Sequence, residues 1–324
     1  MPRVANDAVL WFLGELTSRI VAESGIPSDR YHMGKIILQS LKDAPDFLMQ
    51  IDGARDDKET NKSALERTVR CAYAMKAAGL KIGDVVALMA PNHIDLAIPF
   101  YAGRDSAVFC LQLVFVISDD LRIAFNVNKP RMVFCQSEKA PVVQSVVNEL
   151  KLDTLIVTFD KSDDFCSFNE FLERGMDGPS VEEFRPTDFD PEKTVALLIC
   201  TSGTTGLPKS AVVVHKNLAI TAPYMFSRFN DFPTPTQMSL VVSPLIWLSA
   251  ILNYVRGDSG TRGVHAGIEG RGVLDPAPPA IASRARSAAR PAVPCKLSVH
   301  MPATSLLYKN GCRITHRAYE RAIL

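Results

Sequence analysis

The stretch that decides the fold of this chain is Thr201-Ser202-Gly203-Thr204-Thr205-Gly206-Leu207-Pro208-Lys209-Ser210. It follows the apolar run Val195 to Cys200, and a short apolar run bounded by turn residues predicts a buried strand. The stretch supplies hydroxyls, two glycines and one lysine. Glycines allow backbone N–H groups to approach an anion closely, and a lysine adds a mobile positive charge. These residue types are typical of a loop that binds a polyphosphate.

The stretch differs from the common nucleotide P-loop, in which Gly-Lys-[Ser/Thr] opens a helix. Pro208 stands where that motif has its second glycine. The following residues, Ala211 to Val214, are mostly β-branched and predict a second strand instead of a helix. We therefore expect a strand, the loop, and another strand.

The same stretch resembles the phosphate-loop signature of the adenylate-forming (AMP-binding) enzyme superfamily. In that family the loop reads Thr-Ser-Gly-Thr-Thr-Gly-x-Pro-Lys-Gly and precedes a strand and a His-x-Asn helix start. His215-Lys216-Asn217 follows here, and Ser210 replaces the usual glycine. Residues 79–92 and 125–134 are also similar to the family, most of all to insect luciferase-like and 4-coumarate-CoA-ligase-like acyl-CoA synthetases. The resemblance ends near Val255.

The resemblance implies a carboxylic acid (fatty or aryl acid)–CoA ligase that uses ATP, Mg²⁺ and CoA and acts through an acyl-adenylate. It implies that Lys209 is catalytic. It assigns the ATP phosphates to Thr201, Ser202, Gly203, Thr204, Thr205, Gly206 and Lys209. Trp247 aligns with a motif that helps to wall the acyl or aryl pocket in the family, although burial in the core explains a tryptophan equally well.

Local patterns predict the same fold class, a layered α/β domain with a parallel sheet over residues 1–255. Strands are expected at residues 46–51, 84–90, 132–135, 155–159, 195–200 and 211–214, and helices at 33–41, from 60, at 92–101 and at 140–150. Thr60 is a suitable N-cap and Gly79 a suitable residue after the helix end. Alternating strands and helices favour parallel strands. The charged run Arg55 to Glu59 is expected to be a solvated hairpin end.

Two segments depart from the resemblance. Residues 103–111 carry bulk and charge where the family has a glycine-rich helix end and turn. Residues 256–324 remain unassigned: they are basic, and up to Leu307 they contain no Phe, Tyr or Trp. Such a composition predicts disorder, and a shifted reading frame or alternative splicing would produce it too. A basic arm that binds RNA or acidic lipid is the functional alternative.

None of the family's later motifs, for adenine, ribose, metal or the mobile lysine, is recognised after Val255. The chain is therefore expected to be incomplete, and the alternative to a ligase is an inactive, truncated relative that at most binds ATP, pyrophosphate or a protein partner. Whether it is an enzyme stays open.

Other polar residues give weaker signals. His215 could act beside the loop or could be a surface histidine at a helix start. The pairs Asp163-Asp164 and Glu182-Glu183 are expected to be solvated. The remaining histidines lack metal-ligand spacing, and we expect no metal site built from them: His32, His93, His265, His300 and His316.

Composition limits the partners and the compartment. The net charge is +1, which gives no electrostatic reason to expect nucleic acid. Seven scattered cysteines argue against a disulfide framework and favour a reducing compartment. The uncharged stretch 238–255 is interrupted by polar residues and Pro244, so a core strand and a buried helix are expected instead of a membrane span. We expect an intracellular protein, cytoplasmic or peroxisomal, although the ending Ala322-Ile323-Leu324 is no peroxisomal tripeptide. The oligomeric state is not indicated.

Overall fold

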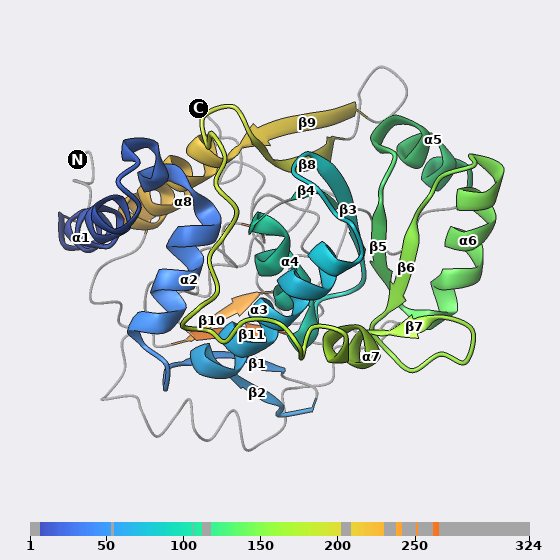
Figure 1. Ribbon diagram of the computed structural model, residues 1–324, viewed down its shortest axis with the longest axis horizontal. Coiled ribbons are helices and arrows are strands. Elements are labelled where there is room, and N and C mark those ends of the chain that lie inside the picture. The colour runs from blue at the N-terminus through green and yellow to red at the C-terminus, as the bar shows by residue number, and fades with distance from the viewer. Residues whose placement is uncertain are drawn as a thin grey trace, which may run out of the picture. The chain divides into compact units, whose positions relative to one another are not determined.

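Two sheets with helices packed around them make up the part of the chain that the structure describes (Figure 1). This computed structural model describes residues 7–52, 55–105, 107–111, 118–201, 209–229, 238–241, 251 and 262–265. The chain divides into two compact units, Met1–Ala277 and Pro278–Leu324, and every described residue belongs to the first.

The larger sheet has the strand order β7-β6-β5-β3-β4-β8-β9. Its strands are β3 (Asp84–Met89), β4 (Ala107–Leu111), β5 (Met132–Cys135), β6 (Leu155–Thr158), β7 (Cys166–Ser167), β8 (Val195–Thr201) and β9 (Lys209–Val214). Neighbouring strands from β7 to β8 are parallel, whereas β9 runs antiparallel to β8. The predicted α/β fold with a parallel sheet is therefore confirmed.

The larger sheet is covered on both faces. In β3, Val86 and Leu88 belong to one buried apolar cluster, and Ala87 and Met89 belong to another. Successive side chains of a strand point to opposite faces, so each cluster lies on its own face. Helices α3 (Asn61–Ala77), α4 (Ala97–Ala102) and α7 (Phe168–Glu173) contribute to the first cluster, and α5 (Ser118–Asn128) and α6 (Ala140–Glu149) contribute to the second.

The other helical segments complete the element order. They are α1 (Asp7–Ser24), α2 (Met33–Asp43) and α8 (His215–Phe229), with short 3₁₀ helices at Pro27–Tyr31, Ile94–Leu96, Gly103–Asp105 and Ser137–Lys139. The helix expected at 92–101 is thus a 3₁₀ turn followed by α4. Helix α8 packs against α1 and α2 on the side of the molecule where the β8–β9 hairpin ends (Figure 1).

Helix α3 shows how local sequence sets an element's ends. The Thr60 side chain accepts a hydrogen bond from the Ser63 N–H, which satisfies one of the free donors of the first turn. At the other end Gly79 has φ +85°, and its N–H bonds to the Lys76 carbonyl. Glycine adopts this left-handed conformation without steric cost. Both predicted ends are confirmed.

The smaller sheet was not predicted as a sheet. It has the order β10-β11-β1-β2, with β1 (Leu48–Asp52), β2 (Lys58–Thr60), β10 (Met238–Val241) and β11 (Arg262–His265). β11 lies within the segment 256–324 for which composition predicted disorder, and it pairs in parallel with β1 and β10. The other residues of that segment lie outside the described part of the chain.

The prediction that residues 55–59 form a solvated hairpin end is wrong at Glu59. Residues 55–58 are exposed, but Glu59 is a buried residue of β2 and pairs with Arg67 of α3. A carboxylate is tolerated in such a position when a guanidinium compensates its charge. The partner lies on another element, so the charged run itself carried no sign of it.

Candidate functional site: the β8–β9 hairpin

The antiparallel pair β8–β9 brings the two ends of the predicted phosphate loop together. Thr201 at the end of β8 pairs with Lys209 at the start of β9, and Cys200 pairs with Ser210. The predicted strand on each side of the loop is therefore present. The loop residues themselves, Ser202, Gly203, Thr204, Thr205 and Gly206, lie outside the described residues, as does Trp247.

A side-chain hydrogen bond ties the loop's exit to helix α5. The Ser210 hydroxyl donates to the Asn128 Oδ1 over 3.2 Å. The Asn128 Nδ2 donates to the Ala124 carbonyl over 2.9 Å, which fixes the orientation of the amide. Leu121 and Phe125 of the same helix are buried. Ser210, the one departure from the family's loop signature, is thus anchored to a packed helix.

The far end of β9 is anchored as well. His215, the first residue of α8, is only 1% exposed. Its Nδ1 accepts from the Met33 N–H over 3.3 Å, and its own N–H donates to the Thr194 carbonyl. Burial lowers its pKa to about 2, and the charge of Arg104 and the ring of His32 act in the same direction. A surface position for His215 is therefore wrong: the side chain is a buried, neutral acceptor.

His32 lies beside His215 as part of the same buried polar group. Its Nδ1 accepts from the Lys35 N–H and so caps α2, while its Nε2–H donates to the Thr187 carbonyl over 3.1 Å. Phe189 stacks on its ring at a centroid distance of 4.0 Å. Desolvation by burial lowers the pKa of His32. Both ring nitrogens make hydrogen bonds to the backbone, so His32 has a structural role: it connects the start of α2 to the segment around Thr187.

Residues 103–111, where the sequence departs from the family, contain the 3₁₀ turn Gly103–Asp105 that follows α4 and the strand β4, which lies between β3 and β8. Arg104 is fully buried, and its guanidinium lies over the Phe100 ring, 4.2 Å from the centroid. Burial lowers its pKa to about 9. The strand β4 was not predicted, because the charged residues 104–105 directly precede its apolar run.

Sequence reasoning missed a cluster that joins the turn after β3 to residues of β2 and α3 and to the residue directly after β6. Arg67 pairs with both Glu59 and Asp95, and the His93 ring lies edge-on to Phe159 at 4.4 Å. Burial lowers the pKa of His93 to about 4. The residues come from four separate segments, so no local motif indicates the cluster.

The pairs Asp163-Asp164 and Glu182-Glu183 are exposed, as predicted.

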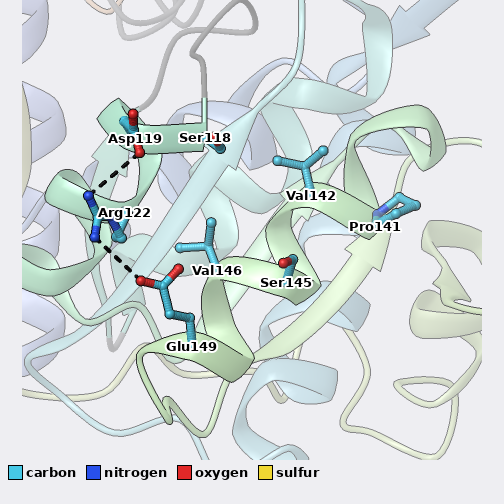
Figure 2. A pocket seen from close by; sticks show the side chains of 8 residues that line it. All are labelled: Ser118, Asp119, Arg122, Pro141, Val142, Ser145, Val146 and Glu149. Atoms are coloured by element: carbon cyan, nitrogen blue, oxygen red, sulfur yellow. Dashed lines mark hydrogen bonds and ion pairs between the residues drawn. The ribbon is translucent and has the colours of Figure 1, made fainter.

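A groove of about 510 Å³ lies between the start of α5 and helix α6 (Figure 2). Pro141, Val142 and Val146 contribute apolar side chains to its lining. At its rim Arg122 lies 3.5 Å from carboxylate oxygens of Asp119 and Glu149. It is lined by the first turns of α5, whereas the hairpin contacts the last residue of that helix.

Within the described residues, no group of three or more His, Cys, Asp or Glu could hold a metal ion. No helix in the described ranges is both long and apolar enough to cross a membrane.

Comparison with known proteins identifies a family that matches this chain. The family described as AMP-binding enzyme matches residues 39–255. The chain is 28% identical over 177 residues to luciferin 4-monooxygenase of Photuris pensylvanica, covering 53% of this chain and 31% of that protein. It is 30% identical over 179 residues to 4-coumarate–CoA ligase 4 of Arabidopsis thaliana, covering 52% and 30%. The matched region thus spans about a third of these relatives.

A solved structure agrees with the sequence comparison at the level of the fold. The luciferase-like enzyme from the nonluminescent mealworm Zophobas morio superposes with a TM-score of 0.67 at 23% identity, covering 74% of this chain and 55% of that one. The two proteins therefore share a fold over that part of the chain.

Proposed function

The chain belongs to the AMP-binding enzyme family, and on that premise we propose that its β8–β9 hairpin binds the phosphates of ATP for the adenylation of a carboxylic acid. The observation that carries the proposal is the pairing of Thr201 with Lys209. It closes a hairpin around a sequence rich in hydroxyls and glycine. The acid is a fatty or aryl acid, and the acyl group then passes to CoA.

The proposed reaction defines what the hairpin has to do. A carboxylate oxygen attacks the α-phosphorus of ATP, the bond from that phosphorus to the bridging oxygen breaks, and pyrophosphate leaves with the bonding electrons. The thiol of CoA then attacks the acyl carbon and loses its proton to solvent, and the bond from that carbon to the phosphate oxygen breaks as AMP leaves. Backbone N–H groups, hydroxyls and a lysine can stabilise the charge that develops on the leaving pyrophosphate.

Each loop residue has a role that follows from its chemistry. Ser202, Thr204 and Thr205 donate hydroxyl hydrogen bonds, and Gly203 and Gly206 let the backbone approach the phosphates. Lys209 supplies the positive charge, which makes its hydrogen bonds to phosphate stronger than neutral ones. The described residues contain no group of three or more His, Cys, Asp or Glu that could hold a metal ion, and no magnesium ligand is assigned among them.

The test is release of pyrophosphate by the full chain with ATP, magnesium and a panel of fatty and aryl acids. We expect release that depends on the acid and disappears in Lys209→Ala. Lys76→Ala, on the exposed face of α3, is the matched control and should keep the wild-type rate. Release that persists in Lys209→Ala would contradict the assignment of the loop.

A second candidate is binding of ATP or pyrophosphate without turnover. The composition of residues 256–324, which resembles none of the family's adenine and ribose motifs, favours it. Pyrophosphate that binds in a Lys209-dependent way, with no acid-dependent release, would select this candidate over the ligase.

A further inference from the structure

We propose that Ser210 is a positioning residue that fixes the exit of the phosphate loop through Asn128 and thereby strengthens the binding of a polyphosphate. The inference rests on the proposed function of the hairpin. It concerns the one residue at which the loop sequence departs from its family, and it adds Asn128, from a helix 82 positions earlier in the chain, to the residues that shape the site.

The contact is built to hold one geometry. Asn128 is the last residue of α5, and its amide is oriented by the bond from its Nδ2 to the Ala124 carbonyl. The helix stops directly after it, because Lys129 has φ 44° and its N–H bonds to the Phe125 carbonyl. Since Phe125 is buried in the core, the Oδ1 that accepts from Ser210 is held on a fixed support.

Because Ser210 lies next to Lys209 in the hairpin, its contact with Asn128 also restrains the lysine. Ser210 pairs with Cys200 and directly follows Lys209, the only cation of the loop. Anchoring position 210 restricts the path of the backbone that carries the lysine. β9 is the outermost strand on this side of the described sheet and pairs with β8 alone, so the side-chain bond adds support that a second neighbouring strand would otherwise give.

Serine and glycine differ here in two ways that act together. Glycine at position 210 would remove the hydroxyl and would also give the backbone more conformations to lose on binding. A loop that is already held in its binding geometry loses less entropy when a ligand binds. Serine at this position should therefore lower the dissociation constant for a ligand that contacts Lys209.

The test measures the affinity of the full chain for inorganic pyrophosphate by titration calorimetry. Loss of one hydrogen bond predicts a dissociation constant about three- to tenfold higher in Ser210→Gly and in Asn128→Ala. Because both variants break the same contact, the double variant should bind no more weakly than the weaker single one. Ser210→Thr keeps the hydroxyl and should bind within about twofold of the wild type.

A matched control separates positioning from general stability. The Ser180 hydroxyl accepts from the Glu183 N–H in an exposed segment away from the hairpin. Ser180→Gly removes a comparable side-chain bond and should leave the dissociation constant unchanged. Thermal unfolding of each variant shows that it is folded, and Asn128→Ala leaves the hairpin sequence intact if Ser210→Gly does not fold.

The outcomes for the inference and for the proposed function are distinct. Wild-type chain that does not bind pyrophosphate removes the proposed function, and the inference falls with it. If the wild-type chain binds pyrophosphate, two results would overturn the inference alone. In the first, Asn128→Ala binds as well as the wild type. In the second, the effects of Ser210→Gly and Asn128→Ala multiply in the double variant.

Discussion

The larger sheet has two regions that are held in different ways. In the parallel region, residues 84–173, every residue of β5 is buried, and the rings of Phe134, Phe159, Phe168 and Phe171 pack together. In the hairpin region, residues 194–229, β9 lies at the sheet edge and Val212 is 59% exposed. There, Ser210 donates a hydrogen bond to Asn128 and His215 accepts one from the Met33 N–H, and both partners lie on helices far away in the sequence.

The two regions differ in the kind of interaction that stabilises them, and each kind has different physical properties. Burial of apolar surface stabilises without fixing direction, and it suits the scaffold. Hydrogen bonds contribute less free energy but have a defined geometry, and they suit a hairpin that has to present a loop. The two regions should therefore differ in how mutation and pH affect them.

The largest expected effect is on the parallel region. Phe134 is 0% exposed and contacts three other phenylalanine rings. Phe134→Ala should lower the free energy of unfolding by about 3–5 kcal/mol, because it removes apolar contacts and leaves a cavity. Urea denaturation measures this. Val127→Ala, at a position 66% exposed, should change it by less than about 0.5 kcal/mol; equal effects would deny that the aromatic cluster supports the sheet.

An intermediate effect, dependent on pH, is expected in the hairpin region. His215 has a pKa of about 2 in the folded chain and its ordinary value of 6.5 when unfolded. Below pH 6.5 the unfolded chain binds a proton that the folded chain does not, so this stability is complete above pH 6.5 and is lost as the pH falls. His215→Asn removes the titration but keeps an acceptor for the Met33 N–H.

Between pH 6.5 and 5, the wild type should lose about 1.5 kcal/mol more of its free energy of unfolding than His215→Asn does. Chemical denaturation at a series of pH values gives both curves. His32 and His93 titrate in both proteins, so their contributions cancel in the difference. Parallel curves would mean that His215 is not held neutral by its burial.

The smallest effect is expected at a feature local to one helix. Thr60→Ala removes the cap that accepts from the Ser63 N–H and should lower the free energy of unfolding by about 1 kcal/mol. Thr60→Ser retains the acceptor and serves as the control. Hydrogen exchange should speed up first at the start of α3. A loss of unfolding free energy as large as that of Phe134→Ala would contradict the expectation that the cap contributes less than the aromatic cluster.

The sequence predicted the features that depend on neighbouring residues. The strand at 132–135, the cap at Thr60 and the turn at Gly79 each follow from a local pattern, and the structure has all three. The strand β4 escaped prediction, because charged residues precede it and its neighbours β3 and β8 come from distant segments.

The candidate site divides in the same way. The hairpin strands follow from the apolar runs beside the loop, whereas the contacts that anchor them join residues far apart in the chain. Ser210 and Asn128 are 82 positions apart, and Met33 and His215 are 182 apart. A histidine that opens a helix looks like a surface residue until the packing of α2 and Phe189 around it is known.

The central claim is that the β8–β9 hairpin binds polyphosphate through Lys209, and calorimetric titration of the full chain with pyrophosphate tests it most directly. Wild-type chain and Lys76→Ala should bind alike. Lys209→Ala should bind at least about tenfold more weakly, because a charge-assisted contact to phosphate is lost. Equal affinity of Lys209→Ala and the wild type, or no binding by either, would contradict the claim.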